Sequence, residues 1–355
     1  SDYANTVRGE AFEACIKEYP DVKAEGRQVG ANEEWRLDLR RLNADEKDFK
    51  DAKEVIKKFG PSHRKLSSFP FMGLNTKYCY LDDIDRRPRE STNLNRLLEK
   101  YFDKKGESPY TGTFEGLCEK FGTFDGNLED TGGDFFAGIK VYPPLGFDPW
   151  PVADLEEDAH NKDLVHHEQK KVEYLYQFCV DNGVPIISHC SDGGFKVGDP
   201  KQAAERANPK RWKEVLESYP NLRLDLAHFG GSNSAFQYQK SWWSPFYKMM
   251  HGGDSSWVKT IIEMVETDRF EHIYTDIAYN GYEERYYPVL KKITENHPKL
   301  KERLMFGSDF CINLLSINSY KKYLRQWLRT EEIAPELKIK MINSNPRKFL
   351  FDEKV

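Results

Sequence analysis

Several features that would place a chain in a specialised class are absent from this sequence. No apolar run approaches the ~20 residues of a membrane-spanning helix, and we find no low-complexity tract, repeat or linker. Charge of neither sign dominates, because 53 Lys and Arg stand against 58 Asp and Glu, interspersed, for a net charge of −5. This balance argues against a nucleic-acid surface. We therefore expect an ordinary soluble protein with neither a nucleic-acid nor a membrane partner.

Paired cysteines are also absent. None of the six cysteines forms a Cys-x-x-Cys pair, so we expect reduced thiols, several of them in the core, in a cytoplasmic protein. The chain begins at Ser1 without Met or a signal-like segment, which indicates a processed, engineered or incomplete chain. The six positions are Cys15, Cys79, Cys118, Cys179, Cys190 and Cys311.

What is present is a regular alternation of short apolar runs with helical periodicity. With 355 residues, 39% of them hydrophobic and 14% aromatic, the chain can bury a large core. From residue 66 onward the pattern strand, loop, helix occurs six times, which predicts parallel strands with crossover helices. The predicted helices include residues 11–19, 48–59, 93–104, 113–121, 209–219, 257–267 and 286–296. We predict an α/β fold in one domain over residues 1–355, with a helical N-terminal region at 1–65 and a barrel at 66–351.

Three of the predicted strands end in a side chain that can bind a metal or move a proton. His189 ends GVPIISH, His228 ends LRLDLAH, and Asp309 ends LMFGSD. The carboxyl ends of the strands of a parallel barrel share one face, and that face holds the active site. Imidazole and carboxylate groups are common ligands of divalent metals. A single histidine at a strand end is usually structural, but three such residues on different strands favour a metal site.

Other polar residues near the strand ends have more than one reading each. Lys140 lies inside the apolar strand FAGIKVY, where it either extends its ammonium to the strand end, anchors a substrate carboxylate or, when carbamylated, bridges two metals. Asp192 and Asp276 are each as well explained by a turn cap or a salt bridge as by a substrate contact. The long segment 230–256 is rich in Gly, Ser and aromatic residues, and we interpret it as a loop that closes over the substrate. The predicted substrate-binding residues are Lys140, Tyr142, Asp192, Trp242, Trp243 and Asp276.

The motifs FAGIKVYPPLGFDP, VPIISHCSDGG, LRLDLAHFGG, GSDF and NSNPRKFLF, in this order, resemble the amidohydrolase superfamily, in the branch of metal-dependent hydrolases that also contains decarboxylases. The resemblance implies a (β/α)8 TIM barrel. It implies metal ligands at His189 on strand five and His228 on strand six. Asp309 matches the strand-eight residue that binds metal and acts as general base. Lys140 matches the strand-four position that is carbamylated in members with two metals.

The resemblance also implies an activity. The expected reaction is hydrolysis of an amide, lactone or related bond of a small, carboxylated or cyclic molecule. A divalent metal, Zn²⁺ before Mn or Fe, activates water and Asp309 takes the proton. His189 or His228, whichever does not bind the metal, polarises the carbonyl instead. One alternative is non-oxidative decarboxylation of an aromatic or enoic acid. Another is a degenerate barrel that serves as a binding module. A homo-oligomer is left open.

One departure from the family pattern bears on these alternatives. Strand one of the family ends in His-x-His, and this chain has no such pair. On the family register residues 66–74 correspond to strand three, so strands one and two are not recognisable. An N-terminal piece outside the given sequence supplies them, or the first 65 residues contain diverged strands, or the metal site is degenerate. We favour the first explanation, because a barrel without two strands exposes its edges.

Overall fold

The computed structural model describes residues 25–29, 32–36, 70–81, 92–102, 136–154, 159–243, 256–310 and 312–351. The chain divides into two compact units. The larger unit comprises residues 68–307 and 330–355, and the smaller unit comprises residues 1–67 and 308–329. The single domain expected from the sequence stays a prediction.

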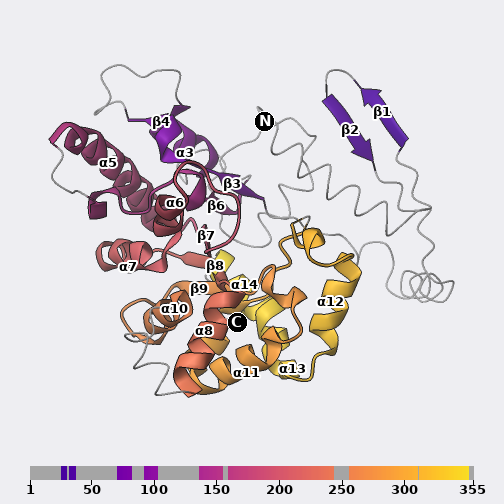
Figure 1. Ribbon diagram of the computed structural model, residues 1–355. Coiled ribbons are helices and arrows are strands. Elements are labelled where there is room, and N and C mark those ends of the chain that lie inside the picture. Colours follow the sequence, from indigo (N-terminus) through magenta and orange to yellow (C-terminus); the bar gives the residue numbers. More distant parts are fainter. Residues whose placement is uncertain are drawn as a thin grey trace. The chain divides into compact units, whose positions relative to one another are not determined.

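The core of the larger unit is a six-stranded sheet in which each strand pairs with the next one along the chain (Figure 1). Every pairing between these neighbours is parallel. Consecutive parallel strands with intervening helices are the arrangement of a (β/α)8 barrel, and the α/β fold predicted from the sequence is confirmed. The strands in sheet order are β3 (Phe71–Gly73), β6 (Gly138–Val141), β7 (Ile186–Ser191), β8 (Leu224–Gly230), β9 (Ile273–Asp276) and β10 (Leu304–Met305).

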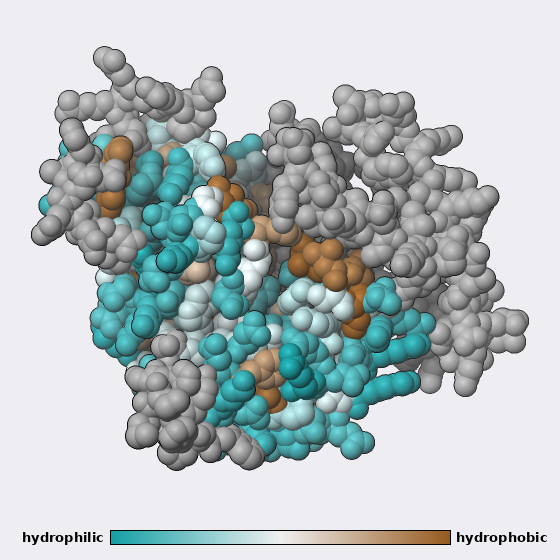
Figure 2. All heavy atoms as spheres, viewed as in Figure 1, coloured by the Kyte–Doolittle hydropathy of each residue, from teal (hydrophilic) through white to brown (hydrophobic). Residues whose placement is uncertain are grey.

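Helices connect the strands and cover the outward face of the sheet. One residue row on that face, Ile139, Ile186, Leu224 and Ile273, is in register across four strands and fully or almost fully buried. Polar side chains predominate on the outer surface of the helices in the view of Figure 2. The connecting helices are α5 (Ala159–Asn182), α6 (Pro200–Ala207), α7 (Pro209–Ser218), α8 (Ser232–Trp243), α10 (Trp257–Glu266) and α11 (Tyr286–Asn296). Two more helices, α13 (Pro335–Ile339) and α14 (Asn345–Phe351), follow the last strand.

The sheet is curved, because both of its edge strands pack on the same helix. Phe71 of β3 and Met305 of β10 belong to one apolar cluster around Phe349 of α14. The ring of Phe71 stacks on that of Phe349 with centroids 6.4 Å apart, and Tyr274 of β9 lies 5.4 Å from the same ring. A flat sheet of this width would keep its edges far apart. The strands therefore wrap around an interior that α14 fills at one end, as the wall of a barrel does.

A short second sheet and helix flank the first strand of the core. β4 (Cys79–Tyr80) pairs in parallel with β5 (Thr92–Asn93), which leads into α3 (Leu94–Phe102). Leu94, Leu98 and Phe102 of this helix are fully buried. The helix predicted at residues 93–104 is thus present, whereas the helix predicted at 113–121 lies outside the described residues.

The smaller unit contains a hairpin that corrects the expectation for the N-terminal region. β1 (Glu25–Val29) and β2 (Asn32–Arg36) pair antiparallel, so this part of the segment predicted to be helical is β-structure. The helices predicted at residues 11–19 and 48–59 lie outside the described residues. The unit also contains the helices η8 (Asn313–Leu315) and α12 (Tyr320–Arg329).

The long loop predicted at residues 230–256 is also corrected. Its first half forms α8, whose Phe236 packs edge-on against Tyr286 of α11 at 6.5 Å and lies under the Arg285 guanidinium at 4.6 Å. The Gly-Gly and Ser-rich composition favours a loop, but these tertiary contacts stabilise a helix.

Within the described residues, none of the helices is long and apolar enough to cross a membrane.

Candidate functional site

The interior of the curved sheet holds ionisable side chains at the level of the middle of the strands. Lys140, Ile187, Asp225 and Tyr274 are in register across four neighbouring strands, so their side chains point to the same face. That face is the interior, because Ile187 and Tyr274 pack around Phe349 of α14. Lys140 and Asp225 therefore point into the interior, where Asp225 is buried and Lys140 is half-buried.

Asp225 is a buried carboxyl group that the sequence analysis did not select. Its side chain is only 1% exposed, and its Oδ1 has no hydrogen-bond partner. Burial and the neighbouring Asp276 carboxylate raise the pKa of Asp225 well above 3.8, while the Lys140 ammonium opposes this rise. An ionisable residue within the apolar run LRLDLAH is the same signal that identified Lys140, and it would have found Asp225.

Two residues further along the strands, the interior face carries the predicted site. Because side chains alternate along a strand, Tyr142, His189 and Asp276 follow Lys140, Ile187 and Tyr274 on the inward side. The rings of Tyr142 and His189 stack with centroids 4.4 Å apart. The His228 ring stands edge-on to His189 at 4.8 Å. The structure thus brings together Tyr142, His189, His228 and Asp276 at the carboxyl ends of β6 to β9.

His189 is held as a neutral imidazole. Its Nε2 lies 3.2 Å from the carbonyl oxygen of Gly193, and a carbonyl only accepts, so Nε2 carries the proton and Nδ1 the lone pair. Burial, His228 and Lys140, in that order, lower the pKa of His189 well below 6.5, and bonds to the backbone of Gly193 and Ser191 only partly offset this. A neutral ring with one nitrogen bonded to a carbonyl is the form in which histidine binds metals.

His228 has the complementary arrangement. Its Nδ1 lies 3.0 Å from the carbonyl oxygen of Ala278, so Nδ1 donates and Nε2 carries the lone pair. Its backbone N–H donates to Oδ1 of Asp276 at 2.9 Å, and the same oxygen accepts from the N–H of Ala278 at 2.8 Å. Asp276 is therefore a turn cap in this structure, one of the readings that its sequence position allowed.

The Ser191–Gly194 turn covers one side of this pair. Gly194 has a φ of +85°, and a Cβ at this position would lie 2.4 Å from the Tyr142 hydroxyl oxygen and 2.9 Å from Cε1 of His189. The N–H of Phe195 donates to the same hydroxyl at 3.2 Å. The turn is thus fitted to Tyr142 and His189. Asp192, in the same turn, is exposed.

Three predicted site residues remain. Two have side chains outside the described atoms, and the third belongs to the smaller unit. Trp242 and Trp243 end α8, and their side chains are outside the described part of the structure. Asp309 belongs to the smaller unit, where it has a φ of +51° and its carbonyl accepts from Ile312 and Asn313 at 3.0 Å each. β10 ends at Met305, earlier than the strand predicted through Asp309.

His189 and His228 fit a divalent metal through the lone pairs that their carbonyl bonds leave on the other ring nitrogens. Within the described ranges, no group of three or more His, Cys, Asp or Glu side chains is arranged to hold a metal ion. Structural and catalytic zinc sites use three or four protein ligands. The two imidazoles could therefore supply only part of the ligand set of such a site.

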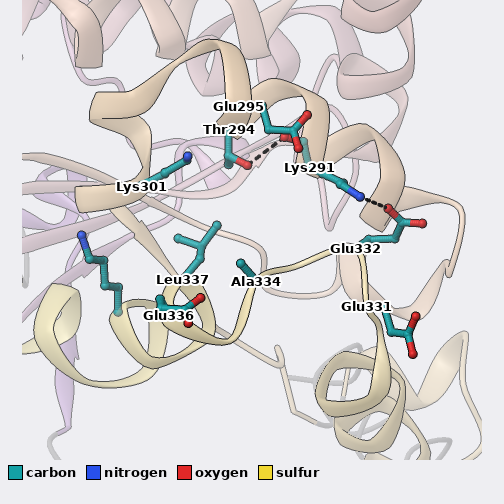
Figure 3. A pocket seen from close by; sticks show the side chains of 10 residues that line it. Lys291, Thr294, Glu295, Lys301, Glu331, Glu332, Ala334, Glu336 and Leu337 are labelled. Carbon is teal, nitrogen blue, oxygen red and sulfur yellow. Dashed lines mark hydrogen bonds and ion pairs between the residues drawn. The ribbon is translucent and has the colours of Figure 1, made fainter.

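Two further features of the larger unit are separate from this pair. A cavity of about 350 Å³ lies among α11, η7 (Pro298–Glu302), α13 and η9 (Lys340–Ser344), with Lys291 paired to Glu332 at 3.1 Å on its wall (Figure 3). Lys301, which lines the cavity, precedes β10, so the cavity lies towards the amino end of that strand.

The described thiols of Cys79, Cys179 and Cys190 are free and buried, as expected, and burial raises the pKa of Cys79 to about 11.

The chain belongs to the amidohydrolase family, whose model matches residues 125–351, more than half of the sequence. The match includes Lys140, His189, His228 and Asp309. None of the curated proteins that were compared matches the chain.

Solved structures of low sequence identity match parts of the chain. An uncharacterised TIM-barrel protein from Bordetella bronchiseptica is 20% identical over 61% of this chain and 57% of its own, with a TM-score of 0.36. The 4-oxalomesaconate hydratase LigJ from Rhodopseudomonas palustris is 15% identical over 61% of this chain and 56% of its own, with a TM-score of 0.36. An amidohydrolase from Burkholderia multivorans with bound zinc is 14% identical over 63% and 67%, with a TM-score of 0.39. The chain thus spans little more than half the length of the first two.

Proposed function

We propose that this chain is a metal-dependent hydrolase that acts on a carbonyl-type bond, an amide, a lactone or a related C–N or C–O bond, of a small organic molecule. One observation carries the proposal: His189 and His228 come from neighbouring strands, face each other, and each have one ring nitrogen bonded to a backbone carbonyl. Such bonds orient metal-binding histidines and fix their tautomers. On each ring the carbonyl bond leaves the lone pair on the other nitrogen, which is the atom that binds a metal.

Each residue of the proposed site has its own role. His189 and His228 would hold a divalent metal, with zinc favoured because imidazole and carboxylate ligands suit it. Such a metal, when bound, polarises a carbonyl and lowers the pKa of bound water to about 7. Asp309 would accept a proton from water at its carboxylate and return it to the leaving group. Tyr142 would line the substrate side of His189, on which it stacks.

Lys140 gives the proposed site its preference for a carboxylated substrate. It lies on the interior face one layer below His189, and its ammonium acts on both His189 and Asp225. A cation in this position can attract the carboxylate of a bound molecule. Carbamylation of the same nitrogen would instead make it a metal ligand, and the mass of the native protein separates the two.

Metal content and turnover test the proposal together. We expect the purified protein to bind about one equivalent of Zn²⁺ or Mn²⁺, measured by elemental analysis and by competition with a fluorescent chelator. The variants His189→Asn and His228→Asn should lose this binding, and Asp309→Asn should lose turnover. His297→Asn is the matched control, since His297 is a partly buried histidine bonded at 2.9 Å to the Tyr238 hydroxyl on α8.

The reaction is tested on a panel of cyclic amides, lactones and aromatic carboxylic acids. Hydrolysis that depends on the added metal and on His228 supports the proposal. Metal-dependent release of carbon dioxide without hydrolysis would show that the reaction is decarboxylation and not hydrolysis. A wild-type protein that binds neither metal at micromolar concentrations and turns over no member of the panel would contradict it.

A further inference from the structure

His228 is out of phase with the strand that carries it. Ala227 pairs with His189 across β7 and β8, so these two positions share the interior face, and the next residue of a regular strand would point outward. Yet the His228 ring lies against His189, 4.8 Å between centroids. The backbone explains this, because His228 and Phe229 have φ values of +70° and +45°. Left-handed backbone is unfavourable for residues other than glycine, so another part of the structure has to stabilise it.

We propose that Asp276 and Asn280, together with the carbonyl of Ala278, are positioning residues that set the backbone, the tautomer and the direction of His228. The proposal rests on the function proposed above, because it concerns the same histidine. The turn after β9 thus has a role that was expected only in part for Asp276, as a turn cap, and not at all for Asn280.

The N–H, the ring Nδ1 and the carbonyl of His228 are each bonded to this one turn, and the carbonyl also accepts from the N–H of Gly231 at 2.8 Å. The His228 N–H donates to Asp276 Oδ1 at 2.9 Å, and its ring Nδ1 donates to Ala278 O at 3.0 Å. Its carbonyl accepts from Nδ2 of Asn280 at 2.6 Å. Asn280 is 3% exposed, so water has little access to compete for this bond. The three bonds hold the backbone N–H, the imidazole ring and the backbone carbonyl of His228. Together they define the orientation of this residue.

The turn is itself held in an uncommon conformation. Tyr279 has φ +68° and ψ −49°, and the N–H of Asn280 donates to Ala278 O at 2.9 Å. These values describe a γ-turn of the rare, strained kind. The N–H of Ala278 donates to Asp276 Oδ1 at 2.8 Å, which ties the start of the turn. Ala278 O thus accepts both from the turn and from the His228 ring, so the shape of the turn and the tautomer of the ring are coupled.

The close approach of β10 leaves the turn little room to move. A Cβ on Gly307 would lie 2.8 Å from Cβ of Ala278, and the N–H of Ile277 donates to Met305 O at 3.1 Å. The turn is therefore fixed by its neighbours and imposes its geometry on His228, rather than following it. In the proposed site this would present Nε2 of His228 to the metal before the metal binds.

The experiment compares Asn280→Ala with wild type in three measurements. The first is the Nδ1–H tautomer of His228 in the metal-free protein, read from ¹⁵N-labelled histidine by NMR, with His228→Asn used to assign the signal. The second is the affinity for Zn²⁺ and Mn²⁺ by chelator competition, which should fall by about 10- to 100-fold, as for other residues that orient metal ligands. The third is kcat, which should fall more than KM rises. Asp276→Ala should behave similarly, whereas Asp276→Asn keeps an acceptor oxygen and should retain most of the wild-type behaviour.

Asn345→Ala is the matched control. Asn345 is fully buried, and its Nδ2 donates to the carbonyl oxygens of Leu304 at 2.7 Å and Lys301 at 3.0 Å. Its loss should lower stability without changing the tautomer of His228 or the metal affinity. If Asn280→Ala does not fold, Asn280→Ser, whose side chain is too short to reach the His228 carbonyl, takes its place.

The outcomes separate the two proposals. If the wild-type protein binds metal and Asn280→Ala keeps the wild-type His228 tautomer and metal affinity, the positioning role alone is overturned. A wild-type protein that binds no metal overturns the proposed function, and the tautomer measurement in the metal-free protein still tests the positioning role. A shift in the His228 tautomer in Asn280→Ala but not in Asn345→Ala supports it.

Discussion

The imidazole rings of His189 and His228 stand edge to face with their centroids 4.8 Å apart, although the two residues are not partners in the register of β7 and β8. His189 points inward because the alternation of its strand puts it there. His228 points inward because its backbone turns left-handed at the end of β8. The pair therefore depends on two different structural causes, one local to a strand and one imposed by the turn after β9.

The buried carboxyl group of Asp225 predicts a particular dependence of stability on pH. Burial and the Asp276 carboxylate raise the pKa of Asp225 in the folded protein. A carboxyl group with a raised pKa contributes most to stability below its unfolded pKa, and this contribution is lost as the pH rises through the folded pKa. Asp225→Asn retains a hydrogen-bond donor but cannot ionise. We expect it to stabilise the protein by about 1–3 kcal/mol more at about pH 8 than at about pH 5.

Urea unfolding followed by tryptophan fluorescence at both pH values measures this difference. The control is Asp163→Asn at an exposed position of α5, which should shift the unfolding free energy equally at the two pH values. An Asp225→Asn variant that is less stable than wild type at both pH values, by the same amount, would show that the ionised carboxylate is accommodated.

Much of the fold could be predicted from local sequence patterns. The helix over Tyr286–Asn296 has the bounds that its periodicity indicated, and α7 and α10 end within a residue of their predicted ends. The apolar runs around β6 to β9 were recognisable because both faces of these strands are buried. By contrast α8 was missed, since its stability comes from contacts of Phe236 with Tyr286 and Arg285, distant in sequence.

The sequence was enough to identify the two histidines of the candidate site, but not the directions in which their side chains point. His189 and His228 were selected because each ends an apolar strand. Strict alternation, however, would have pointed one of them away from the interior. The bond that corrects this joins Asn280 to the His228 carbonyl across 52 residues of sequence, and no local pattern marks Asn280. The same applies to Asp276, which sequence reasoning placed at a strand end without indicating that it binds the His228 backbone.

The contact between Phe349 and the two edge strands predicts a large contribution of α14 to stability. Phe349 is 2% exposed and packs against Phe71, Tyr274 and Met305. Phe349→Ala would leave a cavity where both edges of the curved sheet meet the helix, at a cost of about 3–5 kcal/mol. Tyr78→Ala, at a position that is 71% exposed, should cost less than about 0.5 kcal/mol. Equal midpoints of urea unfolding for the two variants would mean that α14 does not fill the interior.

Two glycines after β7 offer the sharpest test of how closely the turn fits the site. Gly194 and Gly198 have similar positive φ values, +85° and +75°, but a Cβ on Gly194 meets Tyr142 and His189 whereas a Cβ on Gly198 meets nothing within 4 Å. Both alanine variants should lose about 1–2 kcal/mol for the left-handed backbone. Only Gly194→Ala should, in addition, displace the Tyr142 hydroxyl and the His189 ring, lowering affinity for Zn²⁺ by about tenfold or more. If the two variants have the same Zn²⁺ affinity in chelator competition, then the turn packs beside His189 without positioning it.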